Sequence, residues 1–354
     1  MAEWKECLLG DLITFQRGHD LPKSKMSGNG YPVVGSNGII GFHNEYTTEY
    51  PSITVGRSGN VGKPYIVYGR SWSHNTSLYI KEFKGTDPIF IYYFLQTLDL
   101  GNYAGGSAVP TLNRNHIHSL NVRVPADVST QEKIANTLKA LDDKIDKNTD
   151  INKNLEQQVS VLYQSWFEDF EITNGVCPEN WSYQELSTIA DIASGKRPPV
   201  KSDTRNEKTP ISIIGAASVM GFTSEANHTD KILVTGRVGT HGIIQRFNTP
   251  CWTSDNTLVI TSPYYEFTNQ ILHRIDYSSM NRGSTQPLIT QGDMKKVVVL
   301  VPDEDTLAKF EEFAGSLMAK WEANNNENIK LASLRDTLLP KLMSGELDVS
   351  GIDL

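Results

Sequence analysis

The sequence has few cysteines and no long apolar run. Cys7, Cys177 and Cys251 are scattered over 354 residues, and their positions offer neither a disulfide framework nor the ligand spacing of a metal site. The longest notable apolar stretch, Val297 to Val301, suits a buried strand and is too short to cross a bilayer. The first residues lack the basic and apolar segments of a secretory signal. We therefore expect a cytoplasmic protein with no metal and no membrane partner.

Catalytic motifs are also missing. The adjacent prolines Pro198-Pro199 follow Lys196-Arg197 and do not form the Asn/Asp-Pro-Pro-aromatic motif that methyltransferases use to hold a flipped base. The segment from Gly56 to Lys63 resembles a phosphate loop, but it is one residue too long and Pro64 replaces the hydroxyl residue. The sequence thus predicts no catalytic residues and no cofactor bound by this chain.

Charge is distributed unevenly along the chain. The net charge of −8 argues against nucleic-acid binding by the chain as a whole, because phosphates attract Lys and Arg. However, segments 1–128 and 173–302 each carry +1 and hold all eight histidines, whereas 129–172 carries −4 and 303–354 carries −6. The near-neutral segments can still present a basic face, while the acidic segments better suit protein partners.

Landmarks recur about 180 residues apart, which indicates an internal duplication. Gly56-Arg57 returns as Gly236-Arg237, and Trp72 returns as Trp252. Further pairs keep the same order at offsets of 177 or 180 residues: Trp4 and Trp181, Leu9 and Leu186, Gly18 and Gly195, Pro22 and Pro199, Gly35 and Gly215, Gly41-Phe42 and Gly221-Phe222, Gly106-Ser107 and Gly283-Ser284. Each half is therefore predicted to repeat one fold.

Each half begins with a glycine-punctuated region and ends with a helical one. Short β-branched runs such as Ile211–Ile214, separated by turn residues, predict mainly β structure with a few helices. We predict an α+β protein with two mainly β domains, two long antiparallel helices and a pseudo-twofold duplication. The predicted boundaries are a first domain at 1–128, a central helix at 129–172, a second domain at 173–302, a C-terminal helix at 303–345 and a tail at 346–354.

The helical regions repeat apolar or amide residues at alternating spacings of four and three. This heptad pattern runs from Ile134 to Trp166 and from Phe310 to Leu342. It predicts two rods of about 60 Å that pack together as a coiled coil. An ordinary helical hairpin with solvated asparagines is the alternative.

Four asparagines occupy core positions of this pattern and indicate how the helices pair. An antiparallel arrangement places Asn148 opposite Asn328 and Asn152 opposite Asn324, so that each amide meets another and fixes the register.

The same arrangement has two further consequences. It brings the chain after Leu342 back toward Trp4. It also sets Arg335 opposite Leu141, where we expect the guanidinium to reach solvent along its stem.

The ends of the helical regions, Leu162–Phe167 and Leu334–Leu347, resemble the two spacer helices of type I restriction-modification specificity subunits. The Gly-Arg-x-Gly and paired tryptophan segments resemble the target-recognition domains of that family. The resemblance covers essentially the whole chain. It implies a non-catalytic DNA-recognition subunit whose domains each read one half of an interrupted duplex target. Because the two domains differ in sequence, the target should be asymmetric.

The resemblance also implies partners. The helices would set the gap between the two half-sites and dock two modification subunits, which bring S-adenosylmethionine, and a restriction subunit is a further partner of such complexes. Two other classes stay open: a coiled-coil scaffold that binds only proteins, and a self-sufficient DNA-modifying enzyme, which the missing motifs disfavour. Salt-dependent affinity for duplex DNA would separate the scaffold from a DNA-binding subunit.

The glycine-rich segments are the predicted DNA contacts, because there a backbone can approach a groove and project polar side chains. The candidates in the first domain are Arg57, Asn60, Lys63, His74, Asn75 and Ser107. The candidates in the second domain are Arg237, Thr240, His241, Ser254, Asp255 and Ser284. Plausible phosphate contacts, or solvated charges, are Lys23, Lys25, Lys196 and Arg197. The alternative for Arg57 and Arg237 is an internal salt bridge. Trp72 and Trp252 are expected to be core aromatics.

Overall fold

The computed structural model describes residues 3–106, 110–280 and 288–349. The chain forms two compact units, Met1–Thr149 with Asn325–Leu354 and Asp150–Asn324. Since the division falls inside both long helices, each unit contains a globular domain together with part of each long helix.

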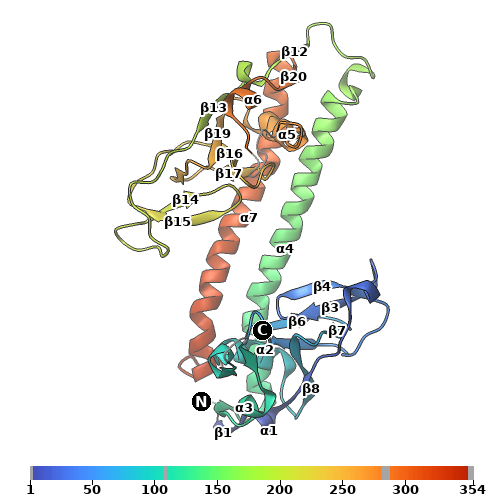
Figure 1. Ribbon diagram of the computed structural model, residues 1–354, viewed down its shortest axis with the longest axis vertical. Helices are drawn as coiled ribbons and strands as arrows, with labels where there is room; N and C mark the ends of the chain where they lie inside the picture. The colour runs from blue at the N-terminus through green and yellow to red at the C-terminus, as the bar shows by residue number, and fades with distance from the viewer. Residues whose placement is uncertain (1–2, 107–109, 281–287, 350–354) are drawn as a thin grey trace. The chain divides into compact units, whose positions relative to one another are not determined.

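The first unit combines small sheets with short helices and parts of two long ones (Figure 1). In chain order its elements are β1 (Trp4–Leu8), α1 (Leu9–Leu12), β2 (Ile13–Arg17), η1 (Lys23–Lys25), β3 (Tyr31–Gly35), β4 (Gly38–His43), β5 (Ser52–Gly56), β6 (Pro64–Val67), β7 (Trp72–Ser73), β8 (Ser77–Phe83), α2 (Pro88–Gln96), η2 (Leu100–Tyr103), β9 (Ala104–Gly105), β10 (Thr111–Leu112), α3 (Arg114–His118), β11 (Asn121–Pro125), the start of α4 (Val128–Phe167) and the end of α7 (Glu304–Ser344).

The second unit repeats this plan. Between α4 and α7 its elements are η3 (Glu171–Thr173), β12 (Ser182–Glu185), η4 (Leu186–Thr188), β13 (Asp191–Ser194), β14 (Ile211–Ile214), β15 (Val219–Thr223), β16 (Ile232–Gly236), β17 (Gln245–Phe247), β18 (Trp252–Thr253), β19 (Thr257–Thr261), α5 (Tyr265–Arg274), α6 (Gln291–Lys295) and β20 (Val298–Val301).

The sheet topology confirms the duplication. The four-stranded sheets have the orders β2-β8-β5-β6 and β13-β19-β16-β17, and the three-stranded sheets have the orders β4-β3-β7 and β15-β14-β18. Even the irregularities match: Val33 pairs in parallel with Trp72 as Ile213 pairs with Trp252. Both hairpins also carry a bulge after these two residues, between Val33 and Val34 and between Ile213 and Ile214.

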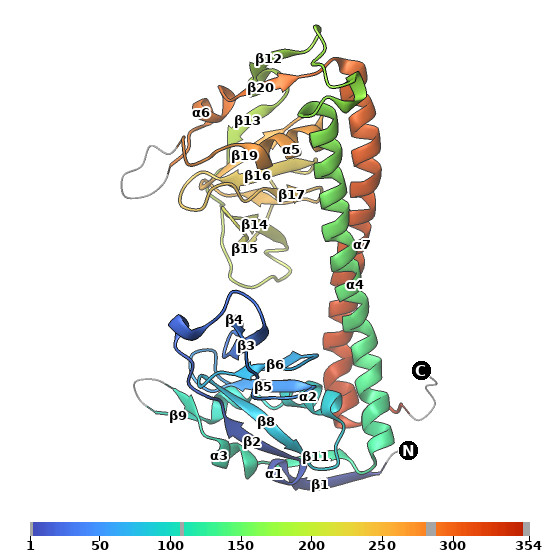
Figure 2. The same ribbon diagram turned by 90° about the vertical axis from the view of Figure 1, so that its right-hand side faces the viewer.

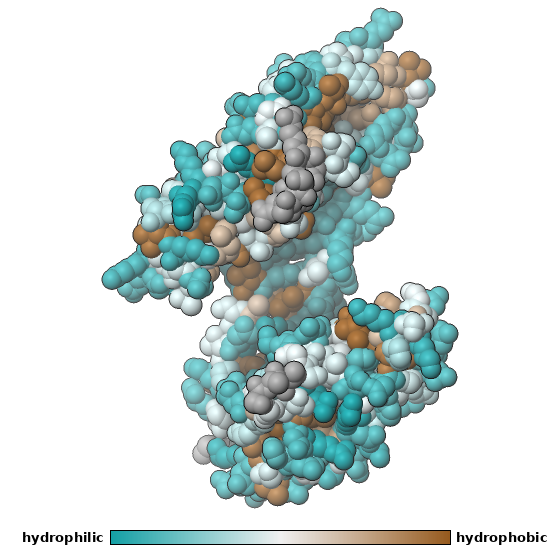
Figure 3. Space-filling model, in the orientation of Figure 1, coloured by the Kyte–Doolittle hydropathy of each residue, from teal (hydrophilic) through white to brown (hydrophobic). Residues whose placement is uncertain are grey.

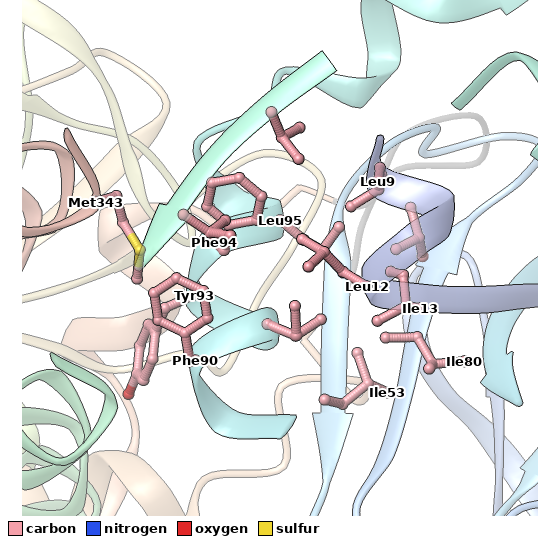
Figure 4. Close-up of a cluster of buried hydrophobic side chains, with 14 of the residues drawn as sticks. Leu9, Leu12, Ile13, Ile53, Ile80, Phe90, Tyr93, Phe94, Leu95 and Met343 are labelled. Carbon is pink, nitrogen blue, oxygen red and sulfur yellow. The ribbon is translucent and has the colours of Figure 1, made fainter. Parts of the chain in front are cut away.

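The core of the first unit lies between its four-stranded sheet and α2. Helix α2 begins where the Asp87 side chain accepts a hydrogen bond from the Phe90 backbone nitrogen at 2.7 Å, which caps the first turn. Figure 4 shows Phe90, Tyr93 and Phe94 of this helix between strand residues such as Ile53 and the side chain of Met343. In the view of Figure 3, hydrophilic residues cover most of the visible surface, with apolar patches between them.

The long helices pair in antiparallel fashion within each unit, as the heptad pattern predicts. In the first unit, Leu138 of α4 and Leu342 of α7 belong to one hydrophobic core. In the second unit, Val159 of α4 and Phe310 of α7 share another. The N-terminal part of one helix therefore lies beside the C-terminal part of the other, and Figure 2 shows the two helices side by side.

Two details of the helices differ from the sequence-based expectation. Helix α4 ends at Phe167 instead of near residue 172, because Phe170 adopts a left-handed conformation (φ 55°) that a right-handed helix cannot continue. Arg335 does not simply extend to solvent. Its guanidinium contacts Asp142 at 2.5 Å and Asp336 at 2.7 Å, so a neighbouring carboxylate neutralises the charge at this position of the seam.

The end of α7 returns to the N-terminal strand of the first unit, as the antiparallel arrangement predicts. Gly345 (φ 79°) lies so close to Trp4 that a Cβ atom there would be 2.7 Å from the indole ring. The Arg123 guanidinium stacks on Trp4 with 5.1 Å to the ring centroid and donates to the Ser344 carbonyl at 3.3 Å. The C-terminal segment is thus part of the first unit.

Candidate functional site

The turns after β5 and β16 are held by equivalent backbone hydrogen bonds. The Arg57 nitrogen donates to the Thr76 carbonyl at 2.8 Å, and its carbonyl accepts from the Leu112 nitrogen at 2.9 Å. In the second unit, the Arg237 nitrogen donates to Asn256 at 2.8 Å and its carbonyl accepts from Ile289 at 3.0 Å. Three chain segments therefore meet at an arginine in each unit.

Glycine is required where each turn folds back on itself. A Cβ atom at Gly56 would lie 1.9 Å from the Asn60 carbonyl oxygen, and one at Gly236 would lie 1.8 Å from that of Thr240. No side chain fits at such distances from a backbone atom, so the recurring Gly-Arg pair is explained by the tightness of the turn.

The arginines of the two turns have no ion-pair partner within the described part of the chain. The side chain of Arg57 is half-buried, and the buried Nε of Arg237 has no hydrogen-bond partner among the described residues. The internal salt bridge considered as the alternative for these two residues is therefore not formed between described residues. Neither guanidinium group is therefore committed to a carboxylate of the described residues.

The other predicted residues of the two turns differ in exposure. Lys63 and Thr240 are exposed, and Asn60 is half-buried. His241 is half-buried, with Nδ1 3.1 Å from the Gly236 carbonyl and Nε2 without a hydrogen-bond partner among the described residues. The carbonyl contact fixes the imidazole beside the turn.

The loops after β7 and β18 form a second equivalent pair. The glycine that follows β2, Gly18, packs against the first loop, and the glycine that follows β13, Gly195, packs against the second. A Cβ atom at Gly18 would lie 2.1 Å from the His74 carbonyl oxygen, and one at Gly195 would lie 2.1 Å from that of Ser254. These close contacts explain why glycine recurs at these positions, where two backbones touch.

The predicted polar residues of these loops are held to different degrees. The Asn75 amide donates to Asp20, and His74 Nδ1 lies 3.0 Å from the Thr76 hydroxyl. Asp255 is exposed, whereas Ser254 is buried and its hydroxyl has no partner among the described residues. The Asn75 amide is thus already paired with Asp20.

The structure does not test every predicted contact. Ser107 and Ser284 lie outside the described residues. Of the two tryptophans, Trp252 is 9% exposed and donates to the Lys196 carbonyl at 2.7 Å, as a packed residue does. Trp72 is half-buried and its ring contacts those of His19 and His43 edge-on.

A recess of about 670 Å³ adjoins the first turn and contains residues that the sequence reasoning missed. Arg57 lines it together with Gln16, Arg17, Leu78, Gly105, Thr111, Leu112, Asn113, Arg114 and His116. Arg17 ends β2 and Arg114 begins α3, so neither belongs to a glycine-rich segment. The Leu112 nitrogen donates to the Arg57 carbonyl, and α3 begins two residues later at Arg114. This tertiary contact brings α3 to the turn, and the Gly-Arg motif does not reveal it.

The four asparagines at helix core positions meet in the pairs expected from antiparallel packing. In the first unit, the Asn148 amide donates to the Asn328 side-chain oxygen at 2.9 Å and to Glu327 at 2.8 Å. In the second unit, the Asn324 amide donates to the Asn152 oxygen at 2.8 Å. Asn148, Asn152 and Asn324 are at most 5% exposed, so each amide is paired inside the helix interface.

Within the residues that the structure describes, no helix is both long and apolar enough to cross a membrane. The same residues contain no group of three or more His, Cys, Asp or Glu side chains that could hold a metal ion.

Two copies of one scaffold, each with a glycine-bounded turn whose arginine has no ion-pair partner among the described residues, define a duplicated protein of two similar units. The model of the type I restriction modification DNA specificity domain matches residues 1–157 and 178–330. These matches cover most of the chain, which therefore belongs to the family of type I restriction-modification specificity subunits. Members of this family are the non-catalytic subunits of their complexes, and the resemblance stated above is confirmed.

Relatives with similar sequences carry the same name. The chain is 25% identical over 302 residues to the type I restriction enzyme MjaIX specificity subunit of Methanocaldococcus jannaschii, covering 73% of this chain and 69% of the relative. It is 21% identical over 356 residues to the HindI specificity subunit of Haemophilus influenzae, covering 73% and 77%. The fold is similar to that of the crystallised type I S subunit from M. genitalium, with a TM-score of 0.67 at 19% identity over 96% of both chains.

Proposed function

We propose that this chain recognises one interrupted, asymmetric duplex DNA sequence, each unit reading one half. The repeated turn is the observation that supports this most. The backbones of Arg57 and Arg237 are held by equivalent hydrogen bonds, yet Lys63 in the first turn corresponds to Ile243 in the second. One backbone that carries two sets of side chains suits two different half-sites.

The predicted contact residues would divide into two groups. Arg57, Arg237 and Lys63 carry the donors that bind phosphates or the acceptor edge of guanine. Asn60 could bind adenine through its amide, while Thr240 offers a hydroxyl group. His74, Asn75, Ser254, Asp255 and His241 would position these groups or contact the groove beside them, and Ser107 and Ser284 remain predicted contacts.

The helices would bind the partners. We propose that α4 and α7 dock two modification subunits, which would carry S-adenosylmethionine, and that a restriction subunit joins the complex where one is encoded. The excess negative charge of segments 129–172 and 303–354 supports contact with protein in preference to phosphate. The buried asparagine pairs would keep the two helices in a single register.

An exchange of domains tests the division of the target. Residues 1–128 would be replaced by the matching domain of a relative in the full chain, and the hybrid would be expressed with the modification partner. Mapping of methylated genomic sites should show a change in one half of the target and none in the other. A change in both halves would contradict independent reading.

The scaffold alternative is tested without knowledge of the target. A DNA-binding subunit in complex with its partner should bind a random duplex with an affinity that falls steeply with salt, because phosphate contacts release counterions.

The domain exchange has a matched control. Replacing the second domain, 173–302, in the same way should alter only the other half-site.

A further inference from the structure

The recess beside the first turn presents cationic side chains from three separate elements. Arg17 comes from the end of β2, Arg57 from the turn after β5 and Arg114 from the start of α3. Leu78 and Leu112, each at most 2% exposed, contribute apolar surface to the recess. No Asp or Glu is among the described residues that line it. The recess is therefore positively charged.

The arginines of the recess differ from four other arginines in the described part of the chain. Arg70, Arg246, Arg274 and Arg335 are each within 2.9 Å of a carboxylate oxygen. By contrast, the guanidinium groups of Arg17, Arg57 and Arg114 have no hydrogen bond or ion pair with any described residue. Unpaired like charges that share a recess repel each other, and an anion placed among them would relieve this repulsion.

The second unit lacks this concentration of charge at the corresponding positions. Ser194 stands in place of Arg17 and Gln291 in place of Arg114, and the Gln291 amide donates to the Ser194 hydroxyl at 2.8 Å. Asp293 replaces His116 and accepts a hydrogen bond from the Thr290 hydroxyl at 2.6 Å. Of the three arginines, the second unit keeps only the counterpart of Arg57, which is Arg237.

We propose that the recess of the first unit binds a phosphodiester group of the DNA backbone, with Arg17 and Arg114 as its ligands beside Arg57. The proposal rests on the proposed DNA recognition and adds to it an anchor that the second unit does not have. Guanidinium groups from three elements offer donors in several directions, which suits the oxygens of a phosphate. A base edge, in contrast, presents its acceptors in one plane.

The test measures how binding depends on salt. The full chain in complex with its modification partner would be titrated onto a fluorescent 30-base-pair duplex of random sequence at several salt concentrations. The variant Arg17→Gln/Arg114→Gln should lower the slope of log affinity against log salt by about one, the loss of one phosphate contact, with a roughly tenfold weaker affinity near 0.1 M salt. The methylated sequence should stay the same.

Two further variants separate the anchor from net charge and from misfolding. Lys5→Gln/Lys81→Gln removes two exposed positive charges from the same unit and should change the slope less. Arg17→Lys/Arg114→Lys keeps both charges and should retain most of the slope. A slope as steep as that of the unchanged chain in the glutamine variant would overturn the proposal, as would an altered base preference in the first half-site. Failure of the proposed function would look different, because the unchanged complex would then show no salt-dependent binding.

Discussion

The two units join their four-stranded sheets to the neighbouring helix in different ways. In the second unit, Arg246 on β17 binds Glu266 near the start of α5 through two contacts of 2.7 Å, and the two side chains are 9% and 3% exposed. In the first unit the equivalent residues are Ile66, which pairs with Ile53 as Arg246 pairs with Leu233, and Ile89 near the start of α2. One backbone thus accepts either a buried ion pair or two apolar side chains.

The surroundings of the ion pair extend this difference. Tyr265 lies against the Arg246 guanidinium, with 4.9 Å to the ring centroid. The Glu311 carboxylate of α7 accepts hydrogen bonds from the backbone nitrogens of Glu266 at 3.1 Å and Phe267 at 2.8 Å. In the first unit, α2 is capped by its own Asp87. The duplicated scaffold therefore fixes where the chain runs, while the chemistry that holds it together has diverged.

The largest effect is expected when the ion pair between Arg246 and Glu266 is broken. Arg246→Ile should destabilise the second unit by about 3–5 kcal/mol, because Glu266 is left buried without its partner. The double variant Arg246→Ile/Glu266→Ile, which copies the first unit, should recover most of the loss. Urea denaturation of the full chain, followed by tryptophan fluorescence, measures both. A double variant as unstable as the single one would show that the two units are not interchangeable at this place.

A somewhat smaller effect is expected at the tight turns that the units share. Gly56→Ala and Gly236→Ala each place a methyl group within 2 Å of a carbonyl oxygen, and each should cost about 3 kcal/mol because backbone must move. Gly69→Ala is the control, since a Cβ atom there meets nothing within 4 Å. Thermal melts of the three variants check this. If only one turn variant were destabilised, the equivalence of the turns would be wrong.

The sequence was sufficient to predict the features that local pattern determines. The duplication, the helix pairing and the special glycines follow from spacing and periodicity, so Asn148 and Asn328 could be paired in advance. The recess around Arg17 and Arg114 could not be predicted in this way. These residues lie far apart in the chain and come together only when α3 packs beside the turn at Arg57.

The ion pair was missed for a similar reason. Arg246 and Glu266 are 20 residues apart on different elements, and no local pattern links them. The equivalent residues of the first unit, Ile66 and Ile89, did not help either. Two isoleucines at these positions predict an apolar contact and give no indication of an ion pair in the second unit. The end of α4 at Phe167 was likewise hidden, since residues 168–172 contain no glycine or proline to mark it.

The Glu311 carboxylate at the start of α5 makes the stability of the second unit depend on pH. Burial raises the pKa of Glu311 from its usual 4.5 to about 7, although the two backbone N–H groups favour the charged form. The folded-state pKa is thus above the unfolded one, so the stability that the neutral form provides is complete below about pH 4.5 and is lost as pH rises toward 7. Stability should fall on the order of 2 kcal/mol across this range.

The variant Glu311→Gln removes the titrating group, and its amide oxygen can still accept one of the two backbone hydrogen bonds without a charge. Melts of the full chain at pH 5 and pH 8 should differ less for Glu311→Gln than for the unchanged protein. Glu312→Gln, at an exposed neighbouring position, is the matched control and should leave the difference unaltered. Equal pH dependence in all three proteins would argue against a raised pKa at Glu311.

The smallest expected effect is the difference in stabilising energy between the two asparagine pairs. Asn324→Leu removes from the Asn152 side-chain oxygen a donor at 2.8 Å in a buried part of the seam. The Asn152 amide keeps its longer bond to the Trp321 carbonyl at 3.2 Å, and the variant should cost about 1–2 kcal/mol. Asn328→Leu should cost less, about 0.5–1 kcal/mol, because the Asn148 amide still donates to Glu327 at 2.8 Å. Double-mutant cycles with Asn152→Leu and Asn148→Leu measure the two coupling energies directly. The Asn152–Asn324 coupling should be the larger. Equal couplings would mean that Glu327 does not support its neighbour, and that the two halves of the seam are equivalent after all.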